Sequence, residues 1–394
     1  MTSSHRGRLR ALAAGGVLAL AAGVLAAAPS SAAPQHLIPG SAPARPAAGP
    51  AADSDSEAAP RSDRQYPSVV LPGRATPLAR VAAAAPPRHD VDGDGISDMI
   101  VMEYDQSTGV YLSSISSWSD YAIYKTDPES SFKDLLPVGD VGGTTKAELL
   151  SLSFDGVLTL YEAGLKSTSA PLWSGRGWQK YNRLVATGDV TGDHRPDLLA
   201  RDHAGDLWLY TGTGSVSNPF NTRVKVGSGW GIYDQIVGAS DVDGDGLGDV
   251  LTRTLTGELW FHKGSGSATA PLKARVKVGT GWNAYNAIVG AGDYSGDGRP
   301  DVLARDTSGR LFLYKGTGTS TAPFAAREQV ATGWNVYDML VVPGDIDGDS
   351  KGDVLARLPS GDMYLYTSTG NAGTATFTAR VKFGTGWNIY KNMI

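Results

Sequence analysis

One acidic stretch of nine residues recurs through this chain at nearly constant intervals. Its clearest copy reads Asp90-Val-Asp92-Gly-Asp94-Gly-Ile-Ser-Asp98, with carboxylates at positions 1, 3, 5 and 9. Consecutive copies start 50, 49, 52, 52 and 52 residues apart, at Asp90, Asp140, Asp189, Asp241, Asp293 and Asp345. Carboxylates at this spacing are typical ligands of a hard cation, and a fixed period of this length is typical of a repeat fold.

Each period contains four short strands separated by turn residues. In the fifth copy, apolar and small residues over 287–292 lead into the acidic loop, and expected strands follow at 302–305, 311–314 and within 327–334. Every copy should turn at a glycine between its second and third strands, with the first copy three residues longer: Gly109, Gly156, Gly205, Gly257, Gly309 and Gly361. Four strands in about 50 residues are the size of a β-propeller blade.

The two ends of the repeat region predict that the blades close into a ring. Residues 387–394 match the start of the first strand in the other copies, and the acidic loop that should follow this strand is the one at Asp90. The C-terminal segment is therefore expected to pair beside residues 99–125, which removes free sheet edges. We predict an all-β, six-bladed propeller of four-stranded blades. Seven blades would require one more blade from the segment before residue 88.

The N-terminal 33 residues have the pattern of a secretory signal peptide. Arg6, Arg8 and Arg10 precede an Ala/Leu-rich run over 11–28 and small residues at 30–33. A retained membrane anchor is the alternative. Residues 34–87 are rich in Ala, Pro, Ser and Asp, which is typical of a disordered spacer or propeptide, although 66–71 could add a strand. The propeller then spans 88–394, and we expect a secreted, extracellular protein.

Charge and cysteine content limit the kinds of partner and the kinds of chemistry that the chain can have. The formal net charge of −5 becomes −8 when the three signal-peptide arginines are subtracted, so nucleic acid is not an expected partner. The chain has no cysteine, so it must fold without disulfides, and thiol catalysis and thiolate metal sites are excluded. After signal cleavage we expect a monomer that does not associate with a membrane.

The repeat resembles the FG-GAP, or VCBS-type, repeats of the integrin α-subunit propeller and of many secreted bacterial proteins. The resemblance covers residues 88–394 and rests on the Asp-x-Asp-x-Asp-Gly-x-x-Asp loop between a small-residue strand and a Val/Leu strand. It implies a β-propeller with Ca²⁺ in the loop between the first two strands of a blade. An EF-hand is excluded because its position 12 should be Glu, whereas this chain has Val101, Thr252, Ala304 and Ala356 there, and a strand follows.

Carried over position by position, the resemblance implies side-chain ligands at positions 1, 3, 5 and 9 and a backbone carbonyl at position 7. The complete sets are Asp90, Asp92, Asp94, Ile96 and Asp98; Asp241, Asp243, Asp245, Leu247 and Asp249; and Asp345, Asp347, Asp349, Lys351 and Asp353. The weaker sets are Asp293, Ser295, Asp297, Arg299 and Asp301, and, with His194 in place of the preferred glycine, Asp189, Thr191, Asp193 and Asp197.

Four to five Ca²⁺ sites are expected from these sets. The second loop keeps only Asp140, Thr144 and Glu148, and we predict no metal there. For any single loop, a metal-free turn rich in Asp and Gly is the alternative. Several loops that each pack four carboxylates into nine residues favour a cation, because the charges would otherwise repel.

Two further residue types recur with the repeat. A Gly-Trp-x-x-Tyr motif places Trp178, Trp230, Trp282, Trp334 and Trp387 between blades. These rings could stack on a carbohydrate, but we favour packing between adjacent blades, because large aromatic residues dominate core energetics. Four arginines that follow the second strand are predicted to form ion pairs between blades: Arg201, Arg253, Arg305 and Arg357.

No catalytic motif is apparent. None of the histidines lies in a Gly-x-Ser-x-Gly or His-Glu-x-x-His context, so we predict no catalytic residues and no organic cofactor. We expect a non-catalytic, calcium-binding propeller that acts as an extracellular binding or adhesion module for a glycan or a surface protein. The alternatives are a polysaccharide lyase or hydrolase with its site in the propeller channel, and a purely structural cell-surface component.

Overall fold

The computed structural model describes residues 89–104, 108–111, 113, 122–124, 132–162 and 171–394. The predicted signal peptide (1–33), the spacer (34–87) and the strand considered at 66–71 lie outside these residues. The chain divides into the units Met1–Ser62 and Asp63–Ile394, and every described residue belongs to the second. No described helix has the length and apolar character that a membrane span requires.

The described residues form six antiparallel sheets of four strands each. The strands of the first three blades are β1 (Met99–Glu103), β2 (Thr108–Tyr111), β3 (Ala122–Tyr124), β4 (Phe132–Gly139), β5 (Glu148–Ser153), β6 (Leu158–Glu162), β7 (Trp173–Gly175), β8 (Tyr181–Gly188), β9 (Asp197–Asp202), β10 (Leu207–Tyr210) and β11 (Val224–Gly227).

The remaining strands build blades four to six and complete the first blade. They are β12 (Tyr233–Ser240), β13 (Asp249–Thr254), β14 (Leu259–His262), β15 (Val276–Gly279), β16 (Tyr285–Gly292), β17 (Asp301–Asp306), β18 (Leu311–Tyr314), β19 (Glu328–Ala331), β20 (Met339–Gly344), β21 (Asp353–Arg357), β22 (Met363–Tyr366), β23 (Val381–Gly384) and β24 (Tyr390–Met393). Short 3-10 helices lie in the connections: η1 (Trp178–Lys180), η2 (Trp230–Ile232), η3 (Trp282–Ala284), η4 (Trp334–Val336), η5 (Gly373–Ala375) and η6 (Trp387–Ile389).

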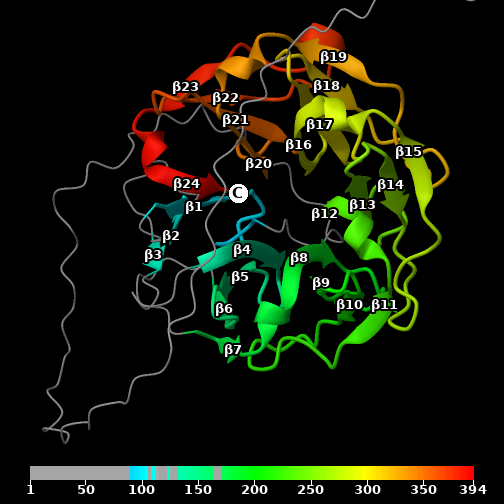
Figure 1. The fold of residues 1–394 in the computed structure, drawn as a ribbon. Coiled ribbons are helices and arrows are strands. Elements are labelled where there is room, and N and C mark those ends of the chain that lie inside the picture. The colour runs from blue at the N-terminus through cyan, green and yellow to red at the C-terminus, as the bar shows by residue number, and fades with distance from the viewer. Residues whose placement is uncertain (1–88, 105–107, 112, 114–121, 125–131, 163–170) are drawn as a thin grey trace, which may run out of the picture. The chain divides into compact units, whose positions relative to one another are not determined.

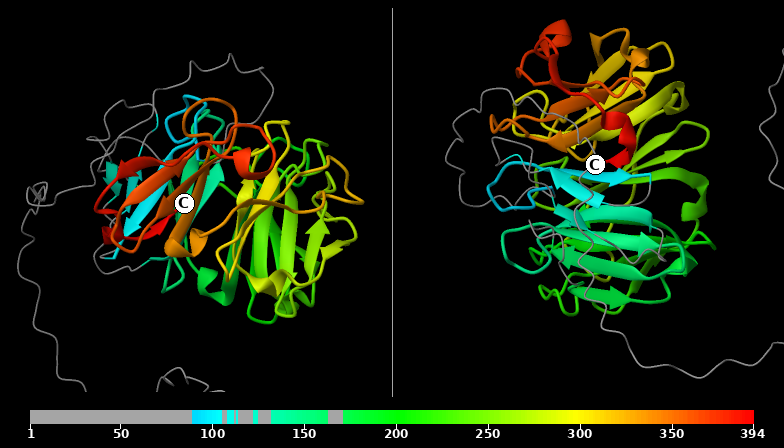
Figure 2. Two further views of the ribbon diagram at one scale, coloured as in Figure 1. Left: turned by 90° about the horizontal axis from the view of Figure 1, so that it is seen from above. Right: turned by 90° about the vertical axis from the view of Figure 1, so that its left-hand side faces the viewer.

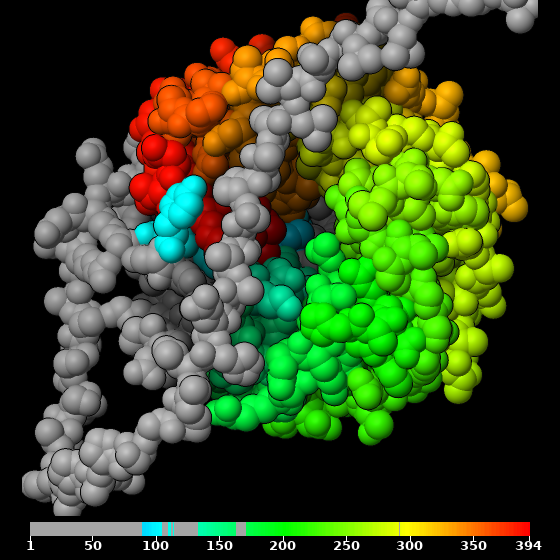
Figure 3. Space-filling view, in the orientation of Figure 1, coloured from blue at the N-terminus to red at the C-terminus, as the bar shows by residue number. Residues whose placement is uncertain are grey.

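The sheets stand as blades around a common centre (Figure 1), with β4, β8, β12, β16, β20 and β24 nearest to it. Seen from the side, strands of the blades run between the two faces of the ring (Figure 2). In the space-filling view, neighbouring blades touch along the ring (Figure 3). The predicted all-β, six-bladed propeller of four-stranded blades is confirmed.

The C-terminal strand closes the ring. Strand β24 pairs with β1, placing Met393 opposite Val101. Ile394 continues the pairing, since its amide donates to the Ile100 carbonyl (2.9 Å) and its carbonyl accepts from the Ile100 amide (2.8 Å). The first blade therefore has the order β24-β1-β2-β3, in which the last strand of the chain completes the first sheet. Closure at residues 99–125, predicted from the phase of the repeat, is confirmed.

The core lies between blades. The second strand of a blade is covered on both faces, and β1 and β5 are buried along their whole length. One cluster joins Leu150 and Leu160 of the second blade to Leu184 and Ala200 of the third. The second strands contain continuous runs of Val and Leu because both of their faces pack against neighbouring blades.

The five motif tryptophans belong to this core. Their exposed fractions are 0–9 %: Trp178, Trp230, Trp282, Trp334 and Trp387. Each ring packs on an aromatic residue of the following blade, as Trp282 does on Tyr314 with ring centroids 4.4 Å apart. Such buried rings offer little face to a sugar, so the structure agrees with packing between blades.

The predicted ion pairs between blades are wrong in detail. Arg357 forms its ion pair with Asp338 of the same blade (3.0 Å). Its contact with the next blade goes to the carbonyls of Trp387 (3.1 Å) and Tyr390 (2.8 Å). Arg201 and Arg305 use the corresponding carbonyls in the same way. The carbonyl of each of these tryptophans also accepts the amide of the tyrosine that ends its 3-10 turn, so the guanidinium adds a second, charged donor to it.

The turn predicted at Thr108-Gly109 in the first blade is also wrong. Both residues belong to β2, where Thr108 pairs with Met102. Tyr111 lies opposite Met99 just as Tyr210 lies opposite Leu198, so this blade is not three residues longer than the others. The aromatic residue that ends the third strand marks the phase of the repeat better than the glycine does.

Candidate metal centre

In five blades the acidic loop connects the first and second strands, and in the first blade it leads into β1, the second strand of that sheet. In the fourth blade, β12 ends at Ser240, the loop begins at Asp241, and β13 begins at Asp249. The 3-10 connections with the motif tryptophans join the last strand of one blade to the first strand of the next, at the opposite ends of these strands. The acidic loops therefore gather on one face of the propeller.

The first carboxylate shapes the loop. In the fourth blade, Asp241 accepts hydrogen bonds from the amides of Gly244 (2.7 Å), Asp245 (3.0 Å) and Gly246 (2.7 Å). Gly244 and Gly246 both have positive φ, 80° and 86°, which glycine adopts without strain. The Asp-x-Asp-Gly-Asp-Gly pattern thus folds the chain tightly around position 1 and turns the remaining carboxylates toward one another.

The ninth carboxylate fastens the loop to the blade. Asp249 is fully buried; it accepts hydrogen bonds from the amide of Val242 (2.8 Å) within the loop and from that of Gly264 (2.8 Å) after β14. The corresponding aspartates make equivalent pairs of bonds: Asp98, Asp197, Asp301 and Asp353. Position 9 therefore has a structural role whether or not a cation is bound.

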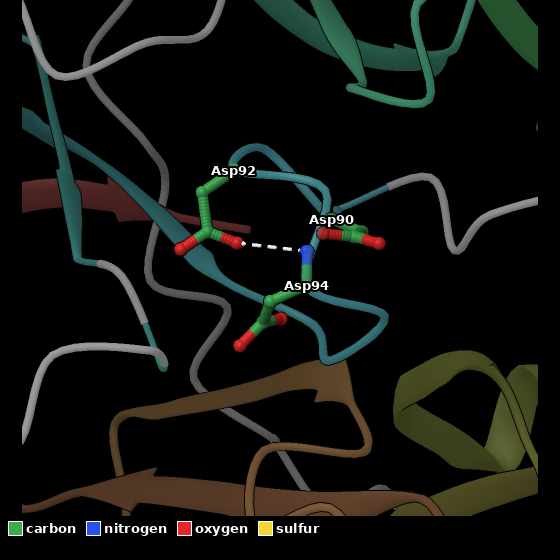
Figure 4. A group of neighbouring side chains, drawn as sticks. All are labelled: Asp90, Asp92 and Asp94. Carbon is green, nitrogen blue, oxygen red and sulfur yellow. Dashed lines mark hydrogen bonds between the residues drawn. The ribbon is translucent and has the colours of Figure 1, made fainter. Parts of the chain in front are cut away.

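Three loops bring three carboxylates close together. Within the described part of the chain, groups whose ligand atoms all lie within 4.8 Å of one another are Asp90, Asp92 and Asp94; Asp241, Asp243 and Asp249; and Asp345, Asp347 and Asp353. Figure 4 shows the first group, in which the Asp94 amide donates to Asp92 (3.1 Å). These are the three loops whose sequences carry four aspartates, and each triad could hold a metal ion.

The loops of the third and fifth blades assemble no such triad from their described residues. In the third, the Thr191 hydroxyl is engaged by Asp197 (3.0 Å), and His194 adopts a positive φ of 62° where the stronger loops have glycine or serine. In the fifth, Ser295 replaces the carboxylate at position 3. The sites at Asp189, Thr191, Asp193 and Asp197, and at Asp293, Ser295, Asp297, Arg299 and Asp301, remain predictions.

Two oxygens at position 3 are buried and lack a hydrogen-bond partner. Oδ1 of Asp243 has none, although this side chain is only 2 % exposed. Oγ of Ser295 in the fifth blade is likewise buried and makes no hydrogen bond of normal geometry. A buried unpaired oxygen costs free energy, and a bound cation would supply the missing partner at the position that the repeat assigns to a ligand.

Burial and mutual repulsion raise the pKa of several carboxylates in these loops. Burial, with a smaller contribution from other carboxylates of their loops, raises the pKa of Asp98 and of Asp249 to about 7. Burial and the neighbouring Asp349 raise the pKa of Asp347 to about 6, and burial raises that of Asp353 well above its usual range. A divalent cation would favour the ionised form of these groups.

Neighbouring loops are joined to one another by backbone hydrogen bonds. The amide at position 8 of one loop donates to the carbonyl at position 1 of the preceding blade: Ser97 to Asp345 (2.9 Å), Ala147 to Asp90 (2.8 Å), Gly248 to Asp189 (2.6 Å) and Gly352 to Asp293 (2.8 Å). The third and fifth loops carry Pro196 and Pro300 at this position, which have no amide hydrogen. The sixth loop is thus linked directly to the loop of the first blade, across the point of ring closure.

The second loop keeps its shape with fewer acidic groups. Asp140 accepts from the amides of Thr144 and Thr145 (both 2.8 Å), and Glu148 accepts from the Val141 amide (2.6 Å). Burial raises the pKa of Glu148 to about 7. Gly142 provides no ligand at position 3, and the absence of a metal from this blade remains a prediction.

Sequence reasoning missed a cation in the fourth loop. Lys263 directly follows β14, and its ammonium group contacts Asp243 and lies 2.9 Å from Asp245. No local pattern announces this contact, because it depends on where the third strand ends above the loop.

The metal-free protein is expected to lose stability as the pH rises from about 4 to 7. The folded state keeps protons on Asp98 and Asp249 up to a pKa of about 7 and on Asp197 and Asp301 up to about 6, while an unfolded Asp loses its proton near pH 3.9. Burial lowers the pKa of His262 to about 4, which opposes the trend with a single group. Urea unfolding of metal-stripped protein should show a loss on the order of a few kcal/mol over this range.

Calcium should reverse this dependence, because it binds the ionised carboxylates and competes with protons. The same urea series in calcium is the control. If the free energy of unfolding changed with pH in the same way with and without calcium, these carboxylates would not be the calcium ligands. A rise in stability of the metal-free protein from pH 4 to 7 would contradict the sign of the predicted effect.

Comparison with known proteins agrees with this geometry. Residues 241–304 and 293–356 match the FG-GAP-like repeat family. No curated protein sequence matches the chain. Among solved structures, the chain is similar to BBS1N in the crystal structure of BBS1N in complex with ARL6DN, soaked with mercury, with 11 % identity and a TM-score of 0.43. This match covers 78 % of this chain and 99 % of that one, and at this score it carries no functional argument.

Proposed function

Because the chain carries FG-GAP-like repeats that form a β-propeller, we propose that its three Asp triads bind Ca²⁺. The observation that carries this proposal is the buried, unpartnered Oδ1 of Asp243 beside two further carboxylates. Oxygen-only ligands suit calcium, which accepts six to eight oxygens, better than they suit zinc or copper. The backbone carbonyls of Ile96, Leu247 and Lys351 would complete the sets.

The bound ions would brace the propeller. Each loop is tied to its own blade through position 9, and several are tied to the preceding blade through position 8. A cation that neutralises the loop therefore stabilises contacts within a blade and between blades. This role needs no reacting substrate, which supports a non-catalytic protein.

We further propose that the propeller is a secreted module that binds an extracellular glycan or protein. Support comes from the signal-peptide pattern and from a ring of non-identical blades that presents two broad faces. Among the described residues, triads of His, Asp or Glu side chains lie only in the repeated loops. A repeated site suits bracing or multivalent binding better than a single active centre.

Calorimetric titration of the full chain with calcium tests the metal assignment. We expect at least three sites, one for each triad, with D347N losing one and D140N in the second blade losing none. Titration without heat of binding, or an unchanged number of sites in D347N, would refute it. Binding to arrayed glycans and to cell-surface extracts, with calcium or chelator, tests the recognition role; release of sugar fragments from polysaccharides would favour the lyase or hydrolase alternative instead.

A further inference from the structure

The fourth metal loop contains a positive charge of its own. Lys263 extends from the end of β14 toward the loop, and the next residue is held in place because the Gly264 amide donates to Asp249 (2.8 Å). The Lys263 ammonium contacts the carboxylate of Asp243 and lies 2.9 Å from that of Asp245. The side chain is 26 % exposed, so its charged end can reach solvent by rotation of its own torsions.

The ammonium satisfies only part of the site. It engages Oδ2 of Asp243, whereas Oδ1 of the same carboxylate is buried and has no partner. Asp241 and Asp249 place ligand oxygens within 4.8 Å of those of Asp243. Oδ1 of Asp243 is therefore left for a metal ion, which binds more oxygen ligands than an ammonium group does.

A divalent ion and the ammonium group cannot share this loop at low cost. Asp243 and Asp245 occupy positions 3 and 5, which are ligand positions in the repeat. A divalent ion and an ammonium group that bind the same carboxylate lie close together and repel strongly in this partly buried loop, where water screens their charges only in part. Binding of the ion therefore requires that Lys263 leave.

The sixth loop has no lysine at the place of Lys263. The residue that corresponds to Lys263 in the sixth blade is Thr367, whose hydroxyl pairs with Thr378 (2.9 Å). Lys351 of that blade pairs with Asp349 (2.6 Å) at position 5, but within the described part of the chain it forms no ion pair with Asp347 at position 3, whereas Lys263 contacts both positions of its loop. In the fifth blade Lys315 occupies the corresponding place, but its ion pair is with Glu328 (3.6 Å) on β19.

We infer that Lys263 is an internal counter-ion that occupies the fourth site in the absence of calcium and is displaced when calcium binds. The inference rests on the proposed calcium sites and deepens them: the fourth site binds calcium more weakly than the sixth. As calcium falls, the fourth site empties before the sixth and recovers its lysine. The fourth blade thus responds to calcium in a range where the sixth remains loaded.

Calcium titration of the full chain by calorimetry, for the natural sequence and for K263M, tests this inference. Methionine keeps most of the length of the side chain and removes the charge. We expect a weaker site in the natural protein that binds calcium at least tenfold more tightly in K263M, while the other sites are unchanged. K315M is the matched control and should leave all three affinities unchanged.

Melting temperatures provide a second readout that does not depend on fitting the titration. In chelator K263M should melt below the natural protein, because the loop loses its counter-ion, and in excess calcium this deficit should disappear. Three calcium sites whose affinities K263M leaves unchanged or weakens would overturn the inference alone. A lack of calcium binding in both proteins would overturn the inference together with the proposed function.

Discussion

Removal of calcium is expected to lower the melting temperature of the protein by about 15 °C, as measured by calorimetry in excess calcium and again after chelation. A ligand at about 100 times its dissociation constant stabilises a folded protein by about 2.7 kcal/mol, so three sites together contribute about 8 kcal/mol. In a large domain each kcal/mol corresponds to about 2 °C. Without the ion, the carboxylates of each triad repel and Oδ1 of Asp243 stays unpaired.

A matched pair of variants separates metal binding from loop structure. Asp90 and Asp140 both occupy position 1, and each accepts two amide hydrogen bonds from its own loop. Only Asp90 belongs to a triad. We expect D90N to lose about a third of the calcium-dependent stabilisation, whereas D140N keeps all of it. Equal melting temperatures in calcium and chelator for the natural protein would contradict the assignment.

Deletion of residues 390–394 is expected to abolish the monomeric fold. The deletion removes β24 from the first sheet and exposes the edge of β1, which invites association with other chains. It also removes Tyr390 and Met393 from the core, where they are 1 % and 4 % exposed. Loss of two large buried side chains costs about 4 to 10 kcal/mol, comparable to the whole stability of a typical protein.

Gel filtration and far-ultraviolet circular dichroism measure this outcome. The truncated chain should elute as aggregates or as an expanded species without a cooperative melt. Two point variants on the same strand supply the scale: M393A should lower stability by about 2 to 5 kcal/mol, whereas K391A, at an exposed position, should stay within about 0.5 kcal/mol of the natural protein. A monomeric truncated protein that melts within a few degrees of the natural one would show that closure by β24 is dispensable.

Most of the fold could be predicted because the repeat supplies the same local signals in nearly every blade. The strands expected at 302–305 and 311–314 appear as β17 (Asp301–Asp306) and β18 (Leu311–Tyr314). The closing pair of β24 and β1 followed from the phase of the copies alone. The exception is Gly109, which resembles a turn residue but lies within β2. The spacing of Tyr111 from Asp98 indicates the correct pairing of β1 with β2.

The sequence predicts which loops form candidate sites, but not which of their carboxylates meet. The three loops with four aspartates are the three that form triads. Which carboxylates meet differs, however, because the first blade uses positions 1, 3 and 5, whereas the fourth and sixth use 1, 3 and 9. This choice depends on small differences in how each loop packs, which a shared motif does not record.

The sequence by itself determined the number of blades, the point of closure and the position of every acidic loop. These properties depend on spacing and on the local conformational preferences of Asp, Gly and β-branched residues, which act over a few neighbouring positions. Only the tertiary structure decided that the motif tryptophans are buried, that Arg357 serves carbonyls of the next connection, and that Lys263 lies in the fourth loop. The physical reason is that these contacts join side chains from separate strands, and strand register and blade packing set the distances between them.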